Sequence, residues 1–588
     1  METIIEKLTK IVGDAFVKAG FDESLGRVTL SNRPDLCEFQ CNGAMMGAKT
    51  YHKSPIDIAN SVAEVLKENK IFASVEAVPP GFINIIINQD FVVDSINEII
   101  EHSENLIKKV EGKPKVVIDY GGPNVAKPLH VGHLRSAIIG EAVKRLAKVL
   151  GYDTIGDIHL GDWGLQIGLI ITEFAVQNPD SPYMKEDYLG PYEPLNIELS
   201  YLNEIYPLAS KKSKEDEEYR ARAKRATFDL QNGRPGYIAF WKEVMRVSVS
   251  DLKKNYENLG VNFELWYGES DSQKYIPDMI EKFVKDGFAH EDQGALVIDV
   301  AKEDDKAPMP PVIVKKTDGS DIYATTDLAT ILQRVKDYDP EMILYFVDNR
   351  QGLHFEQVFR AARKTGIVSD DTLLEFDGFG TMNGKDGKPY KTRDGGVMRL
   401  SDLIDTVVSG ALEKMKESKT GSDLSKDEQD EIAKMIGIAA LKFGDLINHR
   451  AKDYIFDLDK FLSFEGKTGP YILYTMVRLK AILRKAKENG YVSGKINKIY
   501  SDVEKDIMLK ILNTSDVFWQ SFNDRAPSIV AENAYSIASL SNKFYYEKKI
   551  LAEENEEKIN SLLHFCELML KVLQIHMDIL SIKVPEVM

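Results

Sequence analysis

Two histidines in a stretch rich in glycine and proline are the residues best suited to chemistry. Residues 123–133 read Pro-Asn-Val-Ala-Lys-Pro-Leu-His-Val-Gly-His, so His130 and His133 are three apart. If a helix begins there, both imidazoles lie on one face of its first turn. Exposed N–H groups and the helix dipole at that end favour anions such as phosphate. The two imidazoles could donate to phosphate oxygens, while Gly132 lets a flat base approach the backbone.

A pair of histidines at this spacing can also have a structural role or bind a metal. An isolated pair is more often a helix cap or part of a core. A zinc site is less favoured, because no Glu or third ligand follows at metalloprotease spacing. The surroundings favour phosphate binding, because a strand, a Gly/Pro loop and a helix follow one another, as in a nucleotide-binding α/β unit.

A second stretch gathers positive charge. Residues 385–393 read Lys-Asp-Gly-Lys-Pro-Tyr-Lys-Thr-Arg, with four cations in nine residues. A Gly-containing cationic loop suits a triphosphate clamp. A solvated hairpin turn is the alternative interpretation.

The elements that position these residues follow from the apolar pattern. Residues 116–118 predict a strand, and residues 133–150 predict a helix that Gly151 ends. Residues 342–347 predict another strand, and residues 356–364 the helix after it. Together they indicate a parallel sheet covered by helices.

The flanking regions have different patterns. Residues 1–110 alternate helical and strand-like stretches, and residues 111–114 form a linker. Residues 175–258 are dense in Lys and Glu and predict a helical insertion. From residue 401 to the end, the pattern predicts that the chain is almost entirely helical.

Composition limits the class of protein. A chain of 588 residues suggests roughly three to five domains. The net charge of −17 argues against non-specific nucleic-acid binding but allows one RNA partner on a local basic patch. Three cysteines cannot form a disulfide framework, which indicates a reducing cytoplasm. We expect neither a membrane span nor a signal peptide.

The first motif resembles a known family. His-Val-Gly-His is similar to the HIGH signature of class I aminoacyl-tRNA synthetases, and residues 123–136 resemble its form in arginyl enzymes. Further stretches follow in family order, so the resemblance covers essentially the whole chain: residues 161–164, 323–327, 351–354, 466–471 and 584–588. The chain departs from the family at 385–393, where class I enzymes carry Lys-Met-Ser-Lys-Ser. Many arginyl enzymes have a similarly degenerate loop.

The resemblance implies an α/β multidomain fold. A Rossmann-like class I catalytic domain would span residues 115–400, with the helical insertion near 175–258. An N-terminal α+β module at 1–110 would contact tRNA, and an all-α anticodon-binding bundle would span 401–588. A monomer is the expected state.

The resemblance also implies a two-step ligase reaction. The carboxylate of L-arginine attacks the α-phosphate of ATP, and a ribose hydroxyl of the terminal adenosine of tRNA(Arg) then takes the arginyl group. By class analogy that hydroxyl is the 2′-OH. Mg²⁺ would accompany the ATP without a protein ligand. The family further implies that the adenylate forms only when tRNA is bound.

Residue roles around ATP follow by resemblance. The 385–393 loop and the histidines would stabilise developing charge, with Lys391 or Arg393 facing the pyrophosphate and Lys127 opposite. His354, at the start of a helix, is expected near the adenosine. The ATP-binding set is Pro123, Asn124, His130, Gly132, His133 and His354.

The arginine pocket needs a planar carboxylate partner for the guanidinium. Tyr323 and Asp327 share one face if residues 323–327 are helical, and by resemblance both line this pocket. Gln351 lies just past a strand, at the edge where α/β sheets bind ligands. Asn124 is expected on the amino acid, and Asp119 and Glu269 are weaker candidates.

The tRNA contacts rest on the family alone. Aromatic rings stack on splayed bases while cations meet phosphates. The residues expected to contact tRNA are Phe39, Gln40, Asn42, Arg450, Tyr471, Arg478 and Tyr545.

Two other functions stay open at this point. A class I synthetase for cysteine is disfavoured by the lack of a cysteine-rich zinc site, and one for leucine by the lack of a large editing insertion. A non-catalytic RNA-binding paralogue would have no use for the His130/His133 and Tyr323/Asp327 pairs.

Overall fold

A small α+β module begins the chain. This computed structural model describes residues 2–588, apart from residues 192–194, 196, 318–321 and 391–397. The module's sheet is antiparallel, in the order β1-β2-β4-β3. Its elements are α1 (Ile4–Lys18), β1 (Val28–Leu30), β2 (Phe39–Cys41), α2 (Gly43–Tyr51), α3 (Pro55–Lys67), β3 (Phe72–Val78), β4 (Phe82–Ile87) and α4 (Gln89–Glu101).

A four-stranded parallel sheet forms the centre of the molecule. Its order is β11-β10-β5-β6, and every pair is parallel. The sheet and its crossover helices comprise β5 (Lys115–Tyr120), α5 (Val131–Val149), β6 (Asp153–Asp157), α12 (Tyr323–Tyr338), β10 (Met342–Phe346), α13 (Gly352–Lys364) and β11 (Leu373–Phe376). These confirm the strands and helices that the sequence predicts at 116–118, 133–150, 342–347 and 356–364.

Both faces of this sheet are buried. Val116 and Ile118 pack in the same core as α5, whereas Val117 packs with α12 and α13. Alternate side chains of a strand point to opposite faces, so one short apolar strand serves two cores. Ser136 of α5 connects the carboxyl ends of β5 and β10. Its Oγ donates to the Phe346 carbonyl at the end of β10 and accepts the N–H of Gly121, which follows β5.

Helices extend the central region on one side. The insertion contains α6 (Leu165–Gln177), α7 (Leu199–Glu215), α8 (Glu217–Gln231) and α9 (Pro235–Asn258). Beyond it lie α10 (Glu269–Ser272), α11 (Ile276–Lys285) and a small antiparallel sheet of β7 (His290–Asp292), β8 (Ala295–Ile298) and β9 (Val312–Lys315).

The C-terminal third is a helical bundle, as the sequence predicts. Residues 382–383 and 454–455 form the short parallel pair β12 (Met382–Asn383) and β13 (Tyr454–Ile455). The helices are α14 (Leu400–Ser418), α15 (Lys426–Leu446), α16 (Leu458–Phe461), α17 (Gly469–Glu488), α18 (Asp502–Leu512), α19 (Thr514–Asn523), α20 (Pro527–Glu547) and α21 (Glu556–Ile579). Among the described residues, no helix is long and apolar enough to cross a membrane.

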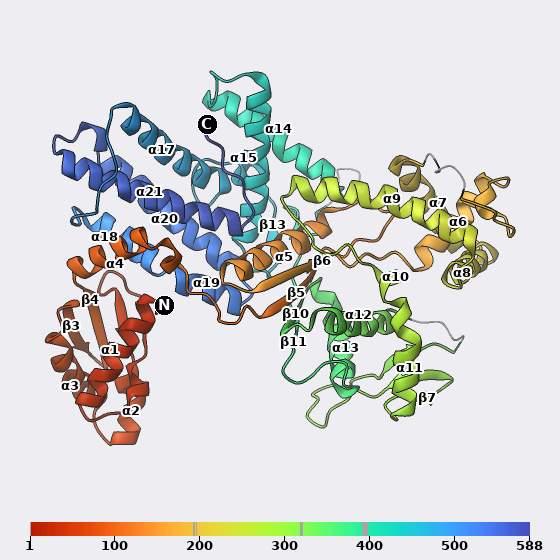
Figure 1. The fold of residues 1–588 in the computed structure, drawn as a ribbon, viewed down its shortest axis with the longest axis horizontal. Helices are drawn as coiled ribbons and strands as arrows, with labels where there is room; N and C mark the ends of the chain where they lie inside the picture. Colours follow the sequence, from red (N-terminus) through yellow and green to blue (C-terminus); the bar gives the residue numbers. More distant parts are fainter. Residues whose placement is uncertain (1, 192–194, 196, 318–321, 391–397) are drawn as a thin grey trace.

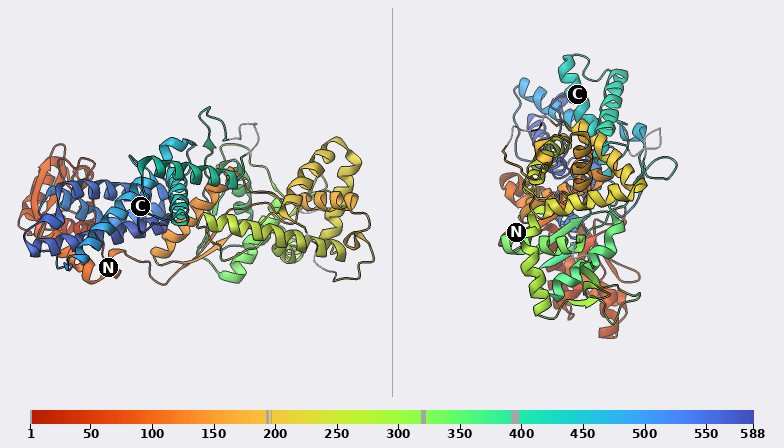
Figure 2. Two further views of the ribbon diagram at one scale, coloured as in Figure 1. Left: turned by 90° about the horizontal axis from the view of Figure 1, so that it is seen from above. Right: turned by 90° about the vertical axis from the view of Figure 1, so that its right-hand side faces the viewer.

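The molecule is elongated. Figures 1 and 2 show the N-terminal module and the helical insertion at opposite ends, with the parallel sheet between them. The N-terminal module lies beside the C-terminal bundle, where α4 packs against α18. The parallel sheet lies between the bundle and the insertion (Figure 1).

Candidate active site

The two histidines lie at the N-terminus of α5 and also cap it. His130 is the N-cap residue, and its Nδ1 accepts the N–H of Gly132 at 3.0 Å. Nδ1 of His133 accepts the N–H of His130 at 3.1 Å. The ring centroids are 3.9 Å apart. Capping and function are thus compatible, because capping uses only one nitrogen of each ring.

Both rings are neutral near pH 7. Burial and the nearby Lys127 ammonium lower the pKa of His130, and burial and His130 lower the pKa of His133 to about 3. Since Nδ1 of each ring accepts a backbone N–H, the ring proton lies on Nε2. The pair therefore presents two neutral N–H donors.

The preceding loop is held by neighbours from distant parts of the chain. Pro123 accepts the N–H of Gly161, and Asn124 and Gly161 form a parallel bridge. Lys127 Nζ stands 4.5 Å over the Tyr206 ring of α7. A Cβ at Gly132 would lie 2.8 Å from Cε1 of His130, so glycine leaves the ring its place.

Residues 398 and 399, which follow the cationic loop in the chain, adjoin the same helix end. Lys385 pairs with Asp457 at 3.4 Å, and Arg399 forms an antiparallel bridge with His130. Lys385 therefore lies beside the C-terminal bundle, and Arg399 lies beside the histidines. Lys391 and Arg393 lie outside the described residues.

Tyr323 and Asp327 lie on the first turns of α12, as their spacing predicts. Oδ2 of Asp327 is 2.6 Å from Nε2 of His354 on α13. Tyr323 is 65% exposed, so its ring is accessible to a ligand. Gln351 ends a short 3-10 helix just after β10 and is exposed.

Glu269 lies close enough to Asp162 and Asp327 for the three carboxylates to interact. Burial raises its pKa to about 7; the Asp162 and Asp327 carboxylates add to this, while His159 opposes it. Asp162 is held by Ser270, which donates to it through both N and Oγ. A partly buried carboxylate group of this kind creates a negative field suited to a guanidinium.

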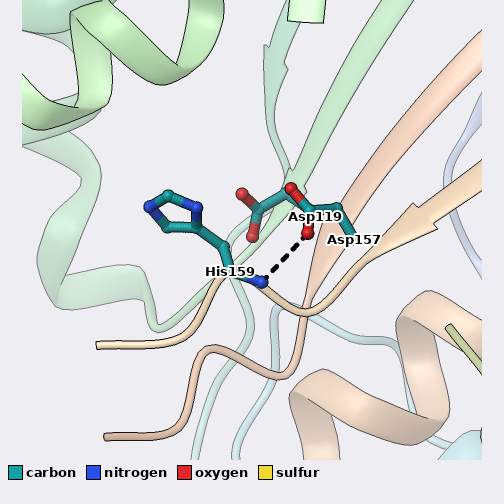
Figure 3. A group of neighbouring side chains, drawn as sticks. All are labelled: Asp119, Asp157 and His159. Carbon is teal, nitrogen blue, oxygen red and sulfur yellow. Dashed lines mark hydrogen bonds between the residues drawn. The ribbon is translucent and has the colours of Figure 1, made fainter. Parts of the chain in front are cut away.

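Asp119 lies deeper, in an ion-pair group that the sequence does not reveal. Arg334 Nη2 lies 2.6 Å from a carboxylate oxygen of both Asp119 and Asp157. Figure 3 shows His159 beside these carboxylates; its backbone N–H donates to Oδ1 of Asp157. The Asp119 side chain is thus already paired with a cation of its own chain.

Two of the expected tRNA residues face inward. Arg450 forms an ion pair with buried Asp377 at 2.7 Å and donates to the Gly378 carbonyl. Phe39 is fully buried in the core of the N-terminal module. By contrast, Gln40 is only partly buried and bonds Asn84, and Asn42 is exposed.

Arg478 lies in a cage of tyrosines. Its guanidinium carbon stands 4.5 Å from the ring centroids of Tyr474 and Tyr545 and 5.4 Å from that of Tyr546. Tyr471 packs nearby on α17 against Tyr535. Tyr546 is 72% exposed, so this cluster offers an accessible aromatic surface.

The comparisons with known proteins divide the chain into three matched parts. A family model described as "tRNA synthetases class I (R), catalytic domain" matches residues 95–458. "Arginyl tRNA synthetase N terminal domain" matches residues 2–87, and "DALR anticodon binding domain" matches residues 472–588.

Relatives and solved structures agree with these models. The arginine–tRNA ligases of Alkaliphilus oremlandii and Agathobacter rectalis are each 49% identical to this chain, with complete coverage of both proteins. The fold is similar to the arginyl-tRNA synthetases of Plasmodium falciparum (TM-score 0.81, 24% identity) and Thermus thermophilus (TM-score 0.78, 18% identity), again over both whole chains. The chain belongs to the arginyl-tRNA synthetases, the class I aminoacyl-tRNA synthetases that are arginine–tRNA ligases.

Proposed function

We propose that this chain activates L-arginine with ATP and transfers it to the 3′-terminal adenosine of tRNA(Arg) at the carboxyl edge of its parallel sheet. The observation that carries the proposal is that two groups share one loop, residues 161–164. Gly161 bridges Asn124 in front of the histidines, and a Cβ at Gly164 would lie 4.0 Å from the Tyr323 hydroxyl. The histidine N–H groups that would donate to phosphate, and Tyr323 of the proposed arginine pocket, therefore lie close to one shared loop.

Asp327, Glu269 and Tyr323 bind the arginine side chain in this proposal. The two carboxylates provide the negative field, and Asp327 can accept two N–H groups in a plane. His354 supports Asp327 through the 2.6 Å contact. Asn124 and Gln351 are the polar groups proposed for the backbone end of the amino acid.

His130 and His133 act on the triphosphate. The arginine carboxylate attacks the α-phosphorus, a new oxygen–phosphorus bond forms, and the bond to pyrophosphate breaks with its electron pair on the leaving oxygen. The Nε2–H donors stabilise the charge that builds on phosphate oxygens without giving up a proton. Lys127 and the 385–393 loop add positive charge, and positioning supplies the rest.

Mg²⁺ would be held by ATP rather than by the protein. Asp119, Asp157 and His159 are close enough to share an ion, since their ligand atoms lie within 4.8 Å of one another. They do not fit a divalent cation, however, because the Arg334 guanidinium already lies 2.6 Å from a carboxylate oxygen of each aspartate and would repel a second cation. We therefore assign no step to a protein-bound metal.

The tRNA is proposed to contact two parts of the molecule, the C-terminal bundle and the N-terminal module. Tyr471, Arg478 and Tyr545 would meet the anticodon, and Gln40 and Asn42 would meet the outer corner. We further propose a monomer that works in the cytoplasm, where its three buried cysteines stay thiols.

The test is aminoacylation of total tRNA with each of the twenty labelled amino acids and ATP. Charging with arginine alone is expected. Charging with another amino acid would contradict the pocket, and no charging at all would indicate a non-catalytic paralogue.

A further inference from the structure

Helix α9 has one polar position on its buried face. Phe240, Val244, Leu252 and Tyr256 form an apolar stripe, and Ser248 lies within it with 2% of its surface exposed. A buried hydroxyl in an apolar stripe is unfavourable unless it is hydrogen-bonded. Ser248 is therefore a position where a specific contact is expected.

The hydrogen-bond partner of Ser248 lies in the loop that leads to the His-Val-Gly-His motif, residues 130–133. Its Oγ accepts the N–H of Ala126 at 3.0 Å. Ala126 is 1% exposed and has φ of 58°, in the left-handed region that costs energy for a residue with a Cβ. Lys127 follows directly and His130 lies four residues on, so this bond fixes the backbone from which both project.

The same helix holds the neighbouring loop. Trp241 Nε1 donates to the Asp162 carbonyl at 3.0 Å, and its ring packs edge-on against Trp163 at 5.3 Å. Both loops that border the proposed site are therefore bonded to α9. Figure 1 shows α9 running from the insertion toward the centre of the molecule.

The far end of α9 is fixed to the C-terminal bundle. Lys442 of α15 is fully buried, and its Nζ donates to the carbonyls of Leu259, which caps α9, and of Ser581. Ser581 Oγ in turn donates to the Gly260 carbonyl at 2.7 Å. One helix thus connects the bundle with both active-site loops.

We propose that Ser248 is a positioning residue for amino-acid activation, which holds Ala126 so that Lys127 and His130 keep their places, and that Lys442 couples this helix to the C-terminal bundle. The proposal rests on the activation reaction above, since Ser248 acts through the signature loop.

The first test compares Ser248→Ala with Ser250→Ala, an exposed serine on the same helix. In pyrophosphate exchange with tRNA present, Ser248→Ala is expected to lower kcat at least about tenfold with the arginine KM within about twofold. Ser248→Thr, which keeps the hydroxyl, should recover most of the loss. Amide exchange of a peptide spanning residues 121–129 should rise in Ser248→Ala alone.

Three results would overturn the role of Ser248. They are equal kcat in the two alanine variants, equal loss in the Ala and Thr variants, and unchanged exchange in the loop peptide. The exchange measurement needs no activity, so it remains decisive if the variant is inactive. A wild type that does not charge arginine contradicts the proposed function instead.

The second test concerns the link to the bundle. Lys442→Met should lower kcat, whereas Lys426→Met, exposed on the same helix, should not. Because both contacts act through α9, the double variant Ser248→Ala/Lys442→Met should lose less than the product of the two single losses. Multiplicative losses would overturn the coupling.

Discussion

Asp327 and His354 meet across two helices: Oδ2 of Asp327 lies 2.6 Å from Nε2 of His354. The carboxylate proposed for the guanidinium is thus already oriented by a side chain of α13. One of its oxygens is engaged, and the bond fixes the plane of the carboxylate, which a bidentate partner requires.

Replacement of Asp327 should weaken arginine binding. Asp327→Ala removes a charge-assisted hydrogen bond worth roughly 1.5–3 kcal/mol, so the arginine KM should rise at least about tenfold. Asp337, on the same helix and exposed, provides the control as Asp337→Ala. An unchanged KM would remove Asp327 from the pocket.

Loss of His354 should affect arginine more than ATP. His354→Ala leaves the Asp327 carboxylate free to rotate, so we expect the arginine KM to rise by about threefold to tenfold. Steady-state kinetics with each substrate varied in turn would measure this. A change confined to the ATP KM would instead support the adenosine contact expected from the sequence.

Arginine binding should depend on pH through Glu269. Burial raises the pKa of Glu269 to about 7, above its ordinary value of 4.5, so its charge is lost as pH falls through about 7. The protonated form cannot attract a guanidinium. The arginine KM should therefore rise from pH 8 to pH 6, and Glu269→Gln should show a high KM without this step. A wild-type KM that stays constant over the interval would contradict this role.

In the N-terminal module, substitution of a core residue should affect stability, whereas substitution of a tRNA-contacting residue should affect tRNA binding. Phe39 is fully buried, so Phe39→Ala should destabilise the module by about 3–5 kcal/mol. Gln40→Ala should leave its melting unchanged and raise the KM for tRNA. Denaturation and charging assays distinguish these effects, and a raised tRNA KM in a fully stable Phe39→Ala protein would contradict the burial.

Local pattern predicted part of this architecture. The strand of β5 and the helix α5 were predictable because apolar spacing and Gly151 mark them. The burial of Phe39 was not predicted, because the family resemblance placed Phe39 with the tRNA contacts; in the structure Phe39 and Cys41 face the buried side of β2 and Gln40 the other side.

Long-range pairing was not predictable. Arg334 lies 215 residues from Asp119, and Arg450 lies 73 residues from Asp377. Sequence gives the charge of each residue but not its partner, so both Asp119 and Arg450 looked available for ligands. Ser248 was missed for the same reason, because its partner Ala126 carries no side-chain signal.

The most direct test concerns the neutral histidine pair at the start of α5. Single-turnover adenylate formation, with tRNA present, should be measured for wild type and His133→Ala, together with tRNA affinity. Loss of one donor to a developing charge costs about 10²–10³ in rate. We predict a fall of that size with tRNA affinity unchanged. A full rate of adenylate formation, with the loss confined to tRNA binding, would contradict the account.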